Sequence, residues 1–208
     1  MSSLSQPPVH VIRVGKAKQE GQSLEAEPYL IVSTTSQYTW LYNDRGTGAH
    51  MDVSIWRPAP TDNTFSIVGD YAQSNYYDPA GTSLIVKAIN DDPSNPLLKP
   101  PVRYAEIWDD KGSGGTHDGS IWWPVPPDGY LSLGFVGQTG YNPPVVPNYA
   151  CIRKDYCKDS VAGQLIWNDK GSGASKDVSV YILDGVKGAF VAQGNYNPYV
   201  GPAYKLAI

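Results

Sequence analysis

One sequence pattern occurs three times in this chain of 208 residues, and such a repeat constrains the fold more strongly than composition does. The pattern reads aromatic-x-Asp-basic-Gly-Ser/Thr-Gly and, after three intervening residues, Asp-x-Ser-Ile/Val-aromatic. Its copies are Tyr42–Trp56, Trp108–Trp122 and Trp167–Tyr181. The internal spacing never changes, whereas successive copies begin 66 and 59 positions apart. We therefore expect whole supersecondary units joined by loops of variable length.

Each copy continues in the same way beyond the pattern. An apolar segment ends in Gln, a Tyr and a Pro follow, and a second apolar run closes the copy. These runs are short, rich in β-branched and aromatic residues, and separated by Gly, Pro, Asn and Asp, which is typical of strands and turns. The Gln-ending segments are 65–73, 131–138 and 188–193, and the closing runs are 83–89, 149–153 and 204–208.

Four strands in each copy predict an all-β fold with three internal four-stranded repeats and pseudo-threefold symmetry. A β-prism and a β-trefoil both satisfy this count. We expect a single domain over residues 1–208, with an N-terminal segment, 1–37, whose alternating residues Val9–Val14 form a strand that completes the third unit. The expected repeat units are approximately 38–92, 104–157 and 163–208.

Charge and composition exclude several classes of protein. The net charge is −4, and no cluster of Lys and Arg provides the surface that nucleic-acid binding requires. The N-terminus has no signal-peptide pattern, and no apolar stretch approaches the ~20 residues of a membrane span. We expect a cytoplasmic protein, or one secreted without a leader. Cys151 and Cys157 are expected to be reduced thiols, since a domain of this size buries enough apolar surface to be stable without a disulfide.

The second copy resembles a known family. Ile107-Trp108, Gly112-Ser113-Gly114, the run Asp118–Trp122, the Pro-rich segment Pro124–Tyr130 and Cys151-Ile152-Arg153 closely resemble the vacuolar protein sorting-associated protein 62 family. The first copy resembles it through Asp52–Trp56 and Tyr71–Tyr76, and the third copy departs from it because Asp184-Gly185-Val186 replaces the Pro-rich segment. The resemblance implies a β-prism, a link to vacuolar trafficking, and similarity to modules that accompany pore-forming toxins in surface recognition.

The repeated loops are the candidate binding sites, and three interpretations apply. The Asp and Gly residues can simply build turns and cap backbone N–H groups. Alternatively, carboxylates and amides bind sugar hydroxyls while a nearby aromatic stacks on the ring. Calcium is a weaker alternative, since each loop repeats only two carboxylates. The candidate ligand-binding residues are Asp44, Gly46, Gly48, Asp52, Asp110, Gly112, Gly114, Asp118, Asp169, Gly171, Gly173, Asp177, Trp123, Tyr77 and Tyr141.

The chain offers little material for catalysis. It has no nucleophile elbow, no zinc-protease helix motif and no phosphate-binding Gly loop. His50 and His117 precede the second repeated Asp at different offsets, and the third copy has Ser175-Lys176 there. We therefore expect a non-enzymatic, lectin-like module without a cofactor. Its expected partner is a glycan or a glycosylated membrane surface, a homodimer is possible through an exposed strand, and the competing class is a trafficking or toxin-associated protein that docks protein or lipid.

Overall fold

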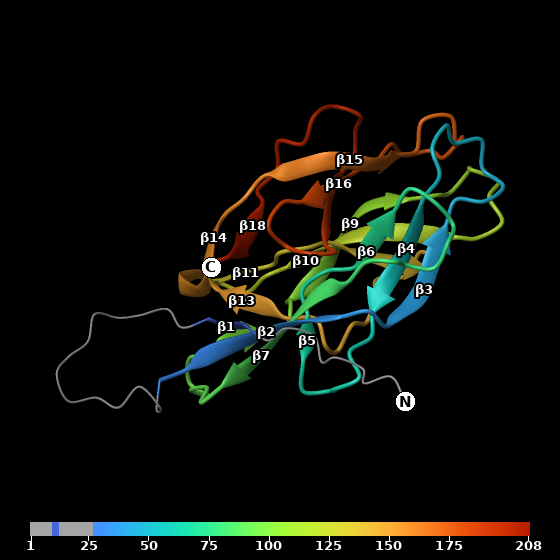
Figure 1. Ribbon diagram of the computed structural model, residues 1–208. Helices are drawn as coiled ribbons and strands as arrows, with labels where there is room; N and C mark the ends of the chain where they lie inside the picture. The colour runs from blue at the N-terminus through green and yellow to red at the C-terminus, as the bar shows by residue number, and fades with distance from the viewer. Residues whose placement is uncertain (1–9, 13–26) are drawn as a thin grey trace, which may run out of the picture.

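Short antiparallel strands make up this computed structural model, which describes residues 10–12 and 27–208 (Figure 1). The described residues also contain a single 3₁₀ turn, Lys154–Tyr156. The all-β prediction is confirmed. The strands are β1 (His10–Ile12), β2 (Tyr29–Thr35), β3 (Tyr38–Asn43), β4 (Ser54–Pro58), β5 (Ser66–Ile67), β6 (Tyr71–Gln73), β7 (Ser83–Ile89), β8 (Leu98–Lys99), β9 (Arg103–Asp109), β10 (Gly119–Val125), β11 (Tyr130–Leu131), β12 (Val136–Thr139), β13 (Cys151–Arg153), β14 (Cys157–Asp159), β15 (Ala162–Asn168), β16 (Ser179–Leu183), β17 (Phe190–Gln193) and β18 (Tyr204–Leu206).

Each copy of the repeated pattern forms a three-stranded sheet. The hairpin strands that flank the Asp/Gly loop pair with each other, and the strand that ends in Gln pairs with the second of them, which gives the sheets β3-β4-β6, β9-β10-β12 and β15-β16-β17. Each hairpin has a bulge in its first strand, beside Leu41, Ile107 or Ile166. Among the described residues no sheet closes on itself, which argues against the barrel of a β-trefoil.

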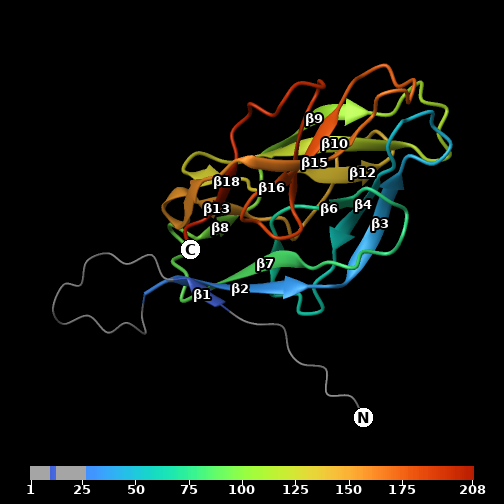
Figure 2. The ribbon, with the colours of Figure 1, turned by 45° about the horizontal axis from the view of Figure 1, so that its top comes forward.

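Three further sheets join the beginning and the end of each copy. A strand that precedes the hairpin pairs with the closing strand of the same copy, as in β2 with β7, β8 with β13 and β14 with β18. Sequence reasoning missed these leading strands, because it placed the first unit boundary at residue 38, after β2. In Figures 1 and 2 these sheets lie at the end of the molecule away from the Asp/Gly loops.

The N-terminal strand differs from the expectation. β1 pairs antiparallel with β2, with Val11 opposite Ile31, and so it extends the sheet of β2, β7 and β5. The described part of Val9–Val14 therefore joins the first copy and does not complete the third. β2 is much closer to β1 in the sequence than any strand of the third copy is. Pairing with β2 therefore closes a shorter loop, at a lower cost in entropy. The signal-peptide prediction rests on residues 1–9, which lie outside the described residues.

The Gln-ending segment of the first two copies is split into two strands of different sheets, β5 with β6 and β11 with β12. The break falls at Gly69 and Gly134, which pack against each other. A Cβ on Gly69 would lie 2.8 Å from the Cα of Gly134 and 3.1 Å from the Cβ of Ala189. These three residues stand four positions before the Gln of their copies. The three copies therefore meet at equivalent positions, and the close approach requires small residues there.

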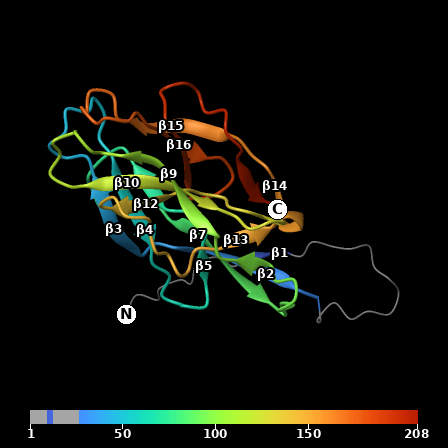
Figure 3. The same cartoon turned by 180° about the vertical axis from the view of Figure 1, so that it is seen from behind.

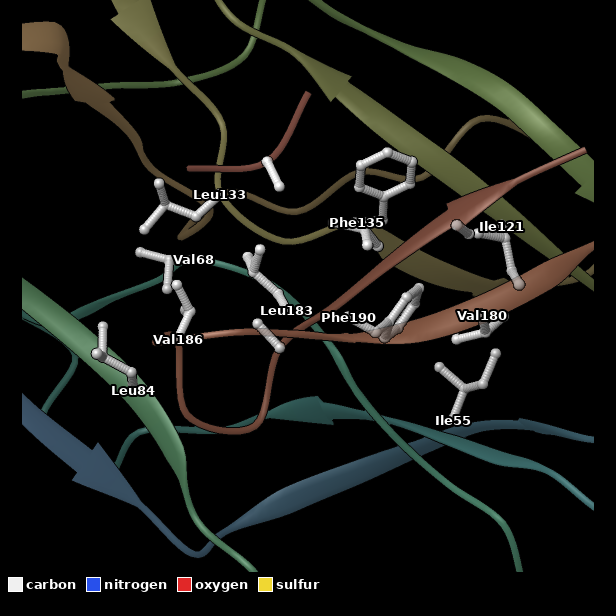
Figure 4. Packing of buried hydrophobic residues seen from close by; sticks show 14 of the residues in the cluster. Ile55, Val68, Leu84, Ile121, Leu133, Phe135, Val180, Leu183, Val186 and Phe190 are labelled. Carbon is white, nitrogen blue, oxygen red and sulfur yellow. The ribbon is translucent and has the colours of Figure 1, made fainter. Parts of the chain in front are cut away.

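Equivalent apolar residues from the three hairpins also meet in the core. Ile55, Ile121 and Val180 follow the repeated Ser and are fully buried. Figure 4 shows their side chains near one another, with Phe135 and Phe190 beside them. One cluster thus contains residues of all three copies, and burial of this apolar surface holds the separate small sheets together.

Two other sequence expectations concern the thiols and the membrane. Cys151 and Cys157 are both free in the structure, as expected. Within residues 10–12 and 27–208, there is no helix of sufficient length and apolar character to cross a membrane.

Candidate functional site

The three Asp/Gly loops lie together at one end of the molecule. Figures 1 and 3 show the loops after β3, β9 and β15 side by side at the end opposite the C-terminus. We call the segments 44–53, 110–119 and 169–178 the apical loops. Each loop hydrogen-bonds to the next in a closed ring of backbone contacts, from Thr116 N to Arg45 O (2.8 Å), from Ser175 N to Lys111 O (2.9 Å) and from His50 N to Lys170 O (2.9 Å).

The first Asp of each loop is buried and serves the loop itself. Asp44, Asp110 and Asp169 are at most 3% exposed. Each accepts a backbone N–H from the residue that follows the second repeated Asp, at 2.9, 3.1 and 2.9 Å. Burial raises the pKa of Asp44, and the hydrogen bonds from Val53, Tyr76 and Trp167 oppose that rise. For these three residues the structure favours the turn-building interpretation over direct contact with a ligand.

The buried carboxylates also link one copy to another. Trp167 Nε1 donates to Asp44 Oδ2, and Trp108 Nε1 donates to Asp169 Oδ2, both at 3.1 Å. Tyr42 occupies the equivalent position in the first copy, and its buried hydroxyl is near Asp110 but has no partner of good hydrogen-bond geometry among the described residues. Burial, followed by the charge of Asp110, raises the pKa of Tyr42 above its ordinary range. The aromatic rings of the three copies pack edge-to-face, with 5.9 Å between the ring centroids of Tyr42 and Trp108 and 5.4 Å between those of Trp108 and Trp167.

The second Asp of each loop is exposed and shares a tyrosine hydroxyl with the first. The hydroxyl of Tyr196 lies 2.9 Å from Asp169 Oδ1 and 2.9 Å from Asp177 Oδ1. Tyr76 joins Asp44 and Asp52 in the same way, at 2.8 and 3.0 Å. Burial and these carboxylates raise the pKa of both tyrosines, so the hydroxyls stay protonated and act as donors.

The second copy has the same arrangement with one contact fewer. Tyr141 donates to Asp110 Oδ1 at 2.9 Å, and its pKa is raised by burial and then by the neighbouring carboxylates of Asp110 and Asp118. The third loop, whose copy departs from the family pattern further along the chain, therefore matches the first loop in its side-chain contacts.

A basic side chain covers each of these tyrosines. Arg45 lies 4.3 Å above the ring of Tyr76, and Lys170 lies 5.0 Å from the ring of Tyr196. Lys111 covers Tyr141 at 4.7 Å. Such cation–π contacts stabilise a cation by ~0.5–1 kcal/mol at exposed sites. The apical surface thus repeats a cation, an aromatic ring and an exposed carboxylate three times.

Sequence reasoning missed part of this set. Tyr141 and Tyr196 stand three positions after the Gln of their copies, and the same count from Gln73 leads to Tyr76, not to Tyr77. Tyr77 is 79% exposed and makes no contact with the apical carboxylates in the described residues. The repeated basic position, Arg45 in the first copy, was visible in the pattern as well.

The other predicted residues have different positions. The first Gly of each loop has a positive φ of 83° (Gly46), 90° (Gly112) or 84° (Gly171), which tight turns require. The second Gly of each loop, Gly48, Gly114 and Gly173, is exposed. Trp123 lies on β10, away from the loops, and donates to Ser132 Oγ at 3.0 Å. Among the described residues no group of three or more His, Cys, Asp and Glu side chains could hold a metal ion.

Comparison with known proteins gives a family and a structural relative. The crystal structure of GNIP1Aa from Chromobacterium piscinae is similar to this chain with 34% sequence identity and a TM-score of 0.68, and the match covers 81% of this chain and 34% of that one. This chain thus spans about a third of the length of GNIP1Aa. No curated protein sequence matches it. The family model for vacuolar protein sorting-associated protein 62 matches residues 23–198, and the chain therefore belongs to that family.

Proposed function

We propose that the protein is a non-enzymatic recognition module that binds carbohydrate on a glycosylated surface through its apical loops. One observation carries this proposal: three loops that are distant in the sequence come together in one ring and expose the same polar and aromatic groups. Several weak, equivalent sites on one face gain avidity on a dense surface.

The groups available to a ligand are the exposed ones. Asp52, Asp118 and Asp177 offer carboxylate oxygens to sugar hydroxyls, and the exposed loop glycines leave the backbone accessible. The buried Asp44, Asp110 and Asp169 hold the loops in shape and have no direct contact with the ligand in this proposal. The cyclic contacts between equivalent residues also support a prism-like arrangement of three units, which we propose as the architecture.

A glycan array of the purified protein, in buffer that contains calcium, tests the proposal. We expect a coherent set of glycan hits that the triple variant D52N/D118N/D177N loses, because a neutral amide is a weaker acceptor than a carboxylate. The matched control is Asp159→Asn, an exposed carboxylate on β14, which retains the hits. A blank array, or hits that survive the triple variant, contradicts the proposal.

The second candidate function is docking to protein or lipid in membrane trafficking, which the description of the family model favours. The acidic net charge of −4 speaks against anionic lipid as the target, since anionic membranes attract polybasic surfaces. Sedimentation with vesicles of phosphatidylcholine and phosphatidylserine that lack glycolipids separates the candidates. Binding to such vesicles supports the trafficking function.

A further inference from the structure

A cavity of about 590 Å³ lies between the second and third copies, away from the apical loops. Trp123, Tyr199 and Tyr204 line it, together with the Pro126–Gly129 turn of the second copy and Gln193 and Gly194 at the end of β17. Its volume is within the roughly 300–1,000 Å³ of small-molecule sites. The Pro-rich segment that the third copy lacks thus forms one wall of this cavity.

The three junctions between copies differ at the position that lines this cavity. Each junction joins the Gln-ending strand of one copy to the hairpin of another, and the residue after the repeated aromatic lies at its centre. This residue is Arg57 at the first junction, Trp123 at the second and Ile182 at the third. Arg57 spans its junction by donating to Gly137 O at 2.7 Å. Ile182 lines a smaller cavity of about 300 Å³.

The floor of the large cavity holds a carbonyl group that the other junctions cover with a hydroxyl. Thr139 Oγ1 donates to Leu41 O at 2.5 Å, and Ser74 Oγ donates to Ile166 O at 2.6 Å. The equivalent pair is Gly194 and Ile107, and glycine has no hydroxyl to donate. A Cβ on Gly194 would lie 3.6 Å from Ile107 O. We therefore place the carbonyl of Ile107 at the cavity wall. Beside it, Gly194 leaves open the space that the side chains of Thr139 and Ser74 fill at the other two junctions.

We infer that this cavity is a second carbohydrate site, independent of the apical loops, which holds a short oligosaccharide. Flat aromatic side chains suit the apolar face of a sugar ring. The Ile107 carbonyl and the exposed carboxylate of Asp128 at the rim are acceptors, and sugar hydroxyls supply donors to both.

Other ligands fit these groups less well. A proline-rich peptide presents carbonyl acceptors and few N–H donors. Two side-chain donors at the centre of the cavity are already used, since Trp123 Nε1 donates to Ser132 Oγ and the Gln193 amide donates to Asn195 Oδ1 at 2.9 Å. An acyl chain would cover the Ile107 carbonyl and offer it no hydrogen-bond donor, which is unfavourable. A ligand that combines an apolar face with several hydroxyl donors satisfies both features.

Saturation-transfer NMR with free lactose, maltose, cellobiose and di-N-acetylchitobiose tests the inference on the full chain. Four variants locate any binding. Trp123→Ile copies the third junction and removes the stacking surface, whereas Trp123→Phe keeps a flat face. Gly194→Ser restores the hydroxyl found at the other junctions, and Gly194→Ala adds the Cβ alone, where it makes only ordinary van der Waals contact.

We expect at least one disaccharide to bind the wild type, with a loss of roughly tenfold in affinity for Gly194→Ser and for Trp123→Ile. Gly194→Ala, Trp123→Phe and the control Ile182→Ala should bind as the wild type does, within about twofold. The apical variant D52N/D118N/D177N should also retain this binding, which distinguishes the cavity from the proposed apical function. Binding of none of the sugars, equal binding by all variants, or binding of a proline decapeptide or dodecanoate in their place overturns the inference.

Discussion

Arg57 and Asp70 form a buried ion pair at a place where the other two copies have apolar pairs. Arg57 Nε and Nη2 donate to the two carboxylate oxygens of Asp70 at 3.2 and 3.0 Å. Asp70 is fully buried and also accepts the N–H of Gly137 at 2.8 Å. The pair thereby ties the first copy to the second. The equivalent pairs are Trp123 with Phe135 and Ile182 with Phe190.

Removing one partner of this pair should be costly. Arg57→Met leaves an uncompensated carboxylate in the core, and we expect a loss of about 3–5 kcal/mol in the free energy of unfolding. The double variant R57I/D70F copies the third junction and should recover most of that loss, since an apolar pair of matching volume replaces the ions. Urea unfolding of the three proteins measures both effects. A single variant as stable as the wild type would show that the pair contributes no stability.

The tyrosine hydroxyl between each pair of apical carboxylates should stabilise its loop. Tyr196→Phe removes the donor that Asp169 and Asp177 share, and we expect a loss of about 1–3 kcal/mol because Asp169 stays buried. Tyr77→Phe is the matched control, since Tyr77 is 79% exposed, and its effect should remain within ~0.5 kcal/mol. Thermal unfolding compares the two variants. Equal effects would contradict a structural role for the shared hydroxyl.

The repeated loops were predictable because their chemistry is local. A positive φ at Gly46 and a carboxylate at Asp44 that caps a nearby N–H belong to the turn itself, so one short pattern specifies both. The burial of Asp44 was not predictable in this way. It depends on Trp167, which is 123 positions away in the sequence, and no single copy of the pattern contains that contact.

The strand pairings show the same limit. The segment 65–73 reads as one apolar run, yet it divides at Gly69 because that residue touches Gly134 in another copy. The pairing of β1 with β2 depends on which sheet edge is near, and periodicity says nothing about edges. Local patterns therefore predicted the strands and turns. Contacts between copies determine which strands pair in each sheet and where the cavity at Trp123 forms.

Calcium removal tests the alternative that the sequence left open for the apical loops. We expect that EDTA leaves the melting temperature unchanged, because each loop has two carboxylates and a tyrosine hydroxyl already lies between them. Calcium prefers six to eight oxygen ligands, and among the described residues no cluster of three acidic or metal-ligating side chains occurs. Thermal unfolding with EDTA and with excess calcium checks this. A rise in melting temperature with calcium alone, absent with magnesium, would support a calcium site.

Stability should fall as the pH rises from about 9 to about 12, and the two cysteines should cause the first part of the fall. Burial raises the pKa of Cys151 and of Cys157 to about 12. Between the unfolded and the folded pKa the folded state holds more protons, so the free energy of unfolding decreases with pH by up to ~1.4 kcal/mol per unit for each group. Urea unfolding from about pH 8 to about pH 10 measures the slope, since an unfolded thiol titrates near 8.5. The variant C151A/C157A should flatten it, and an unchanged slope would show that the thiols are not responsible.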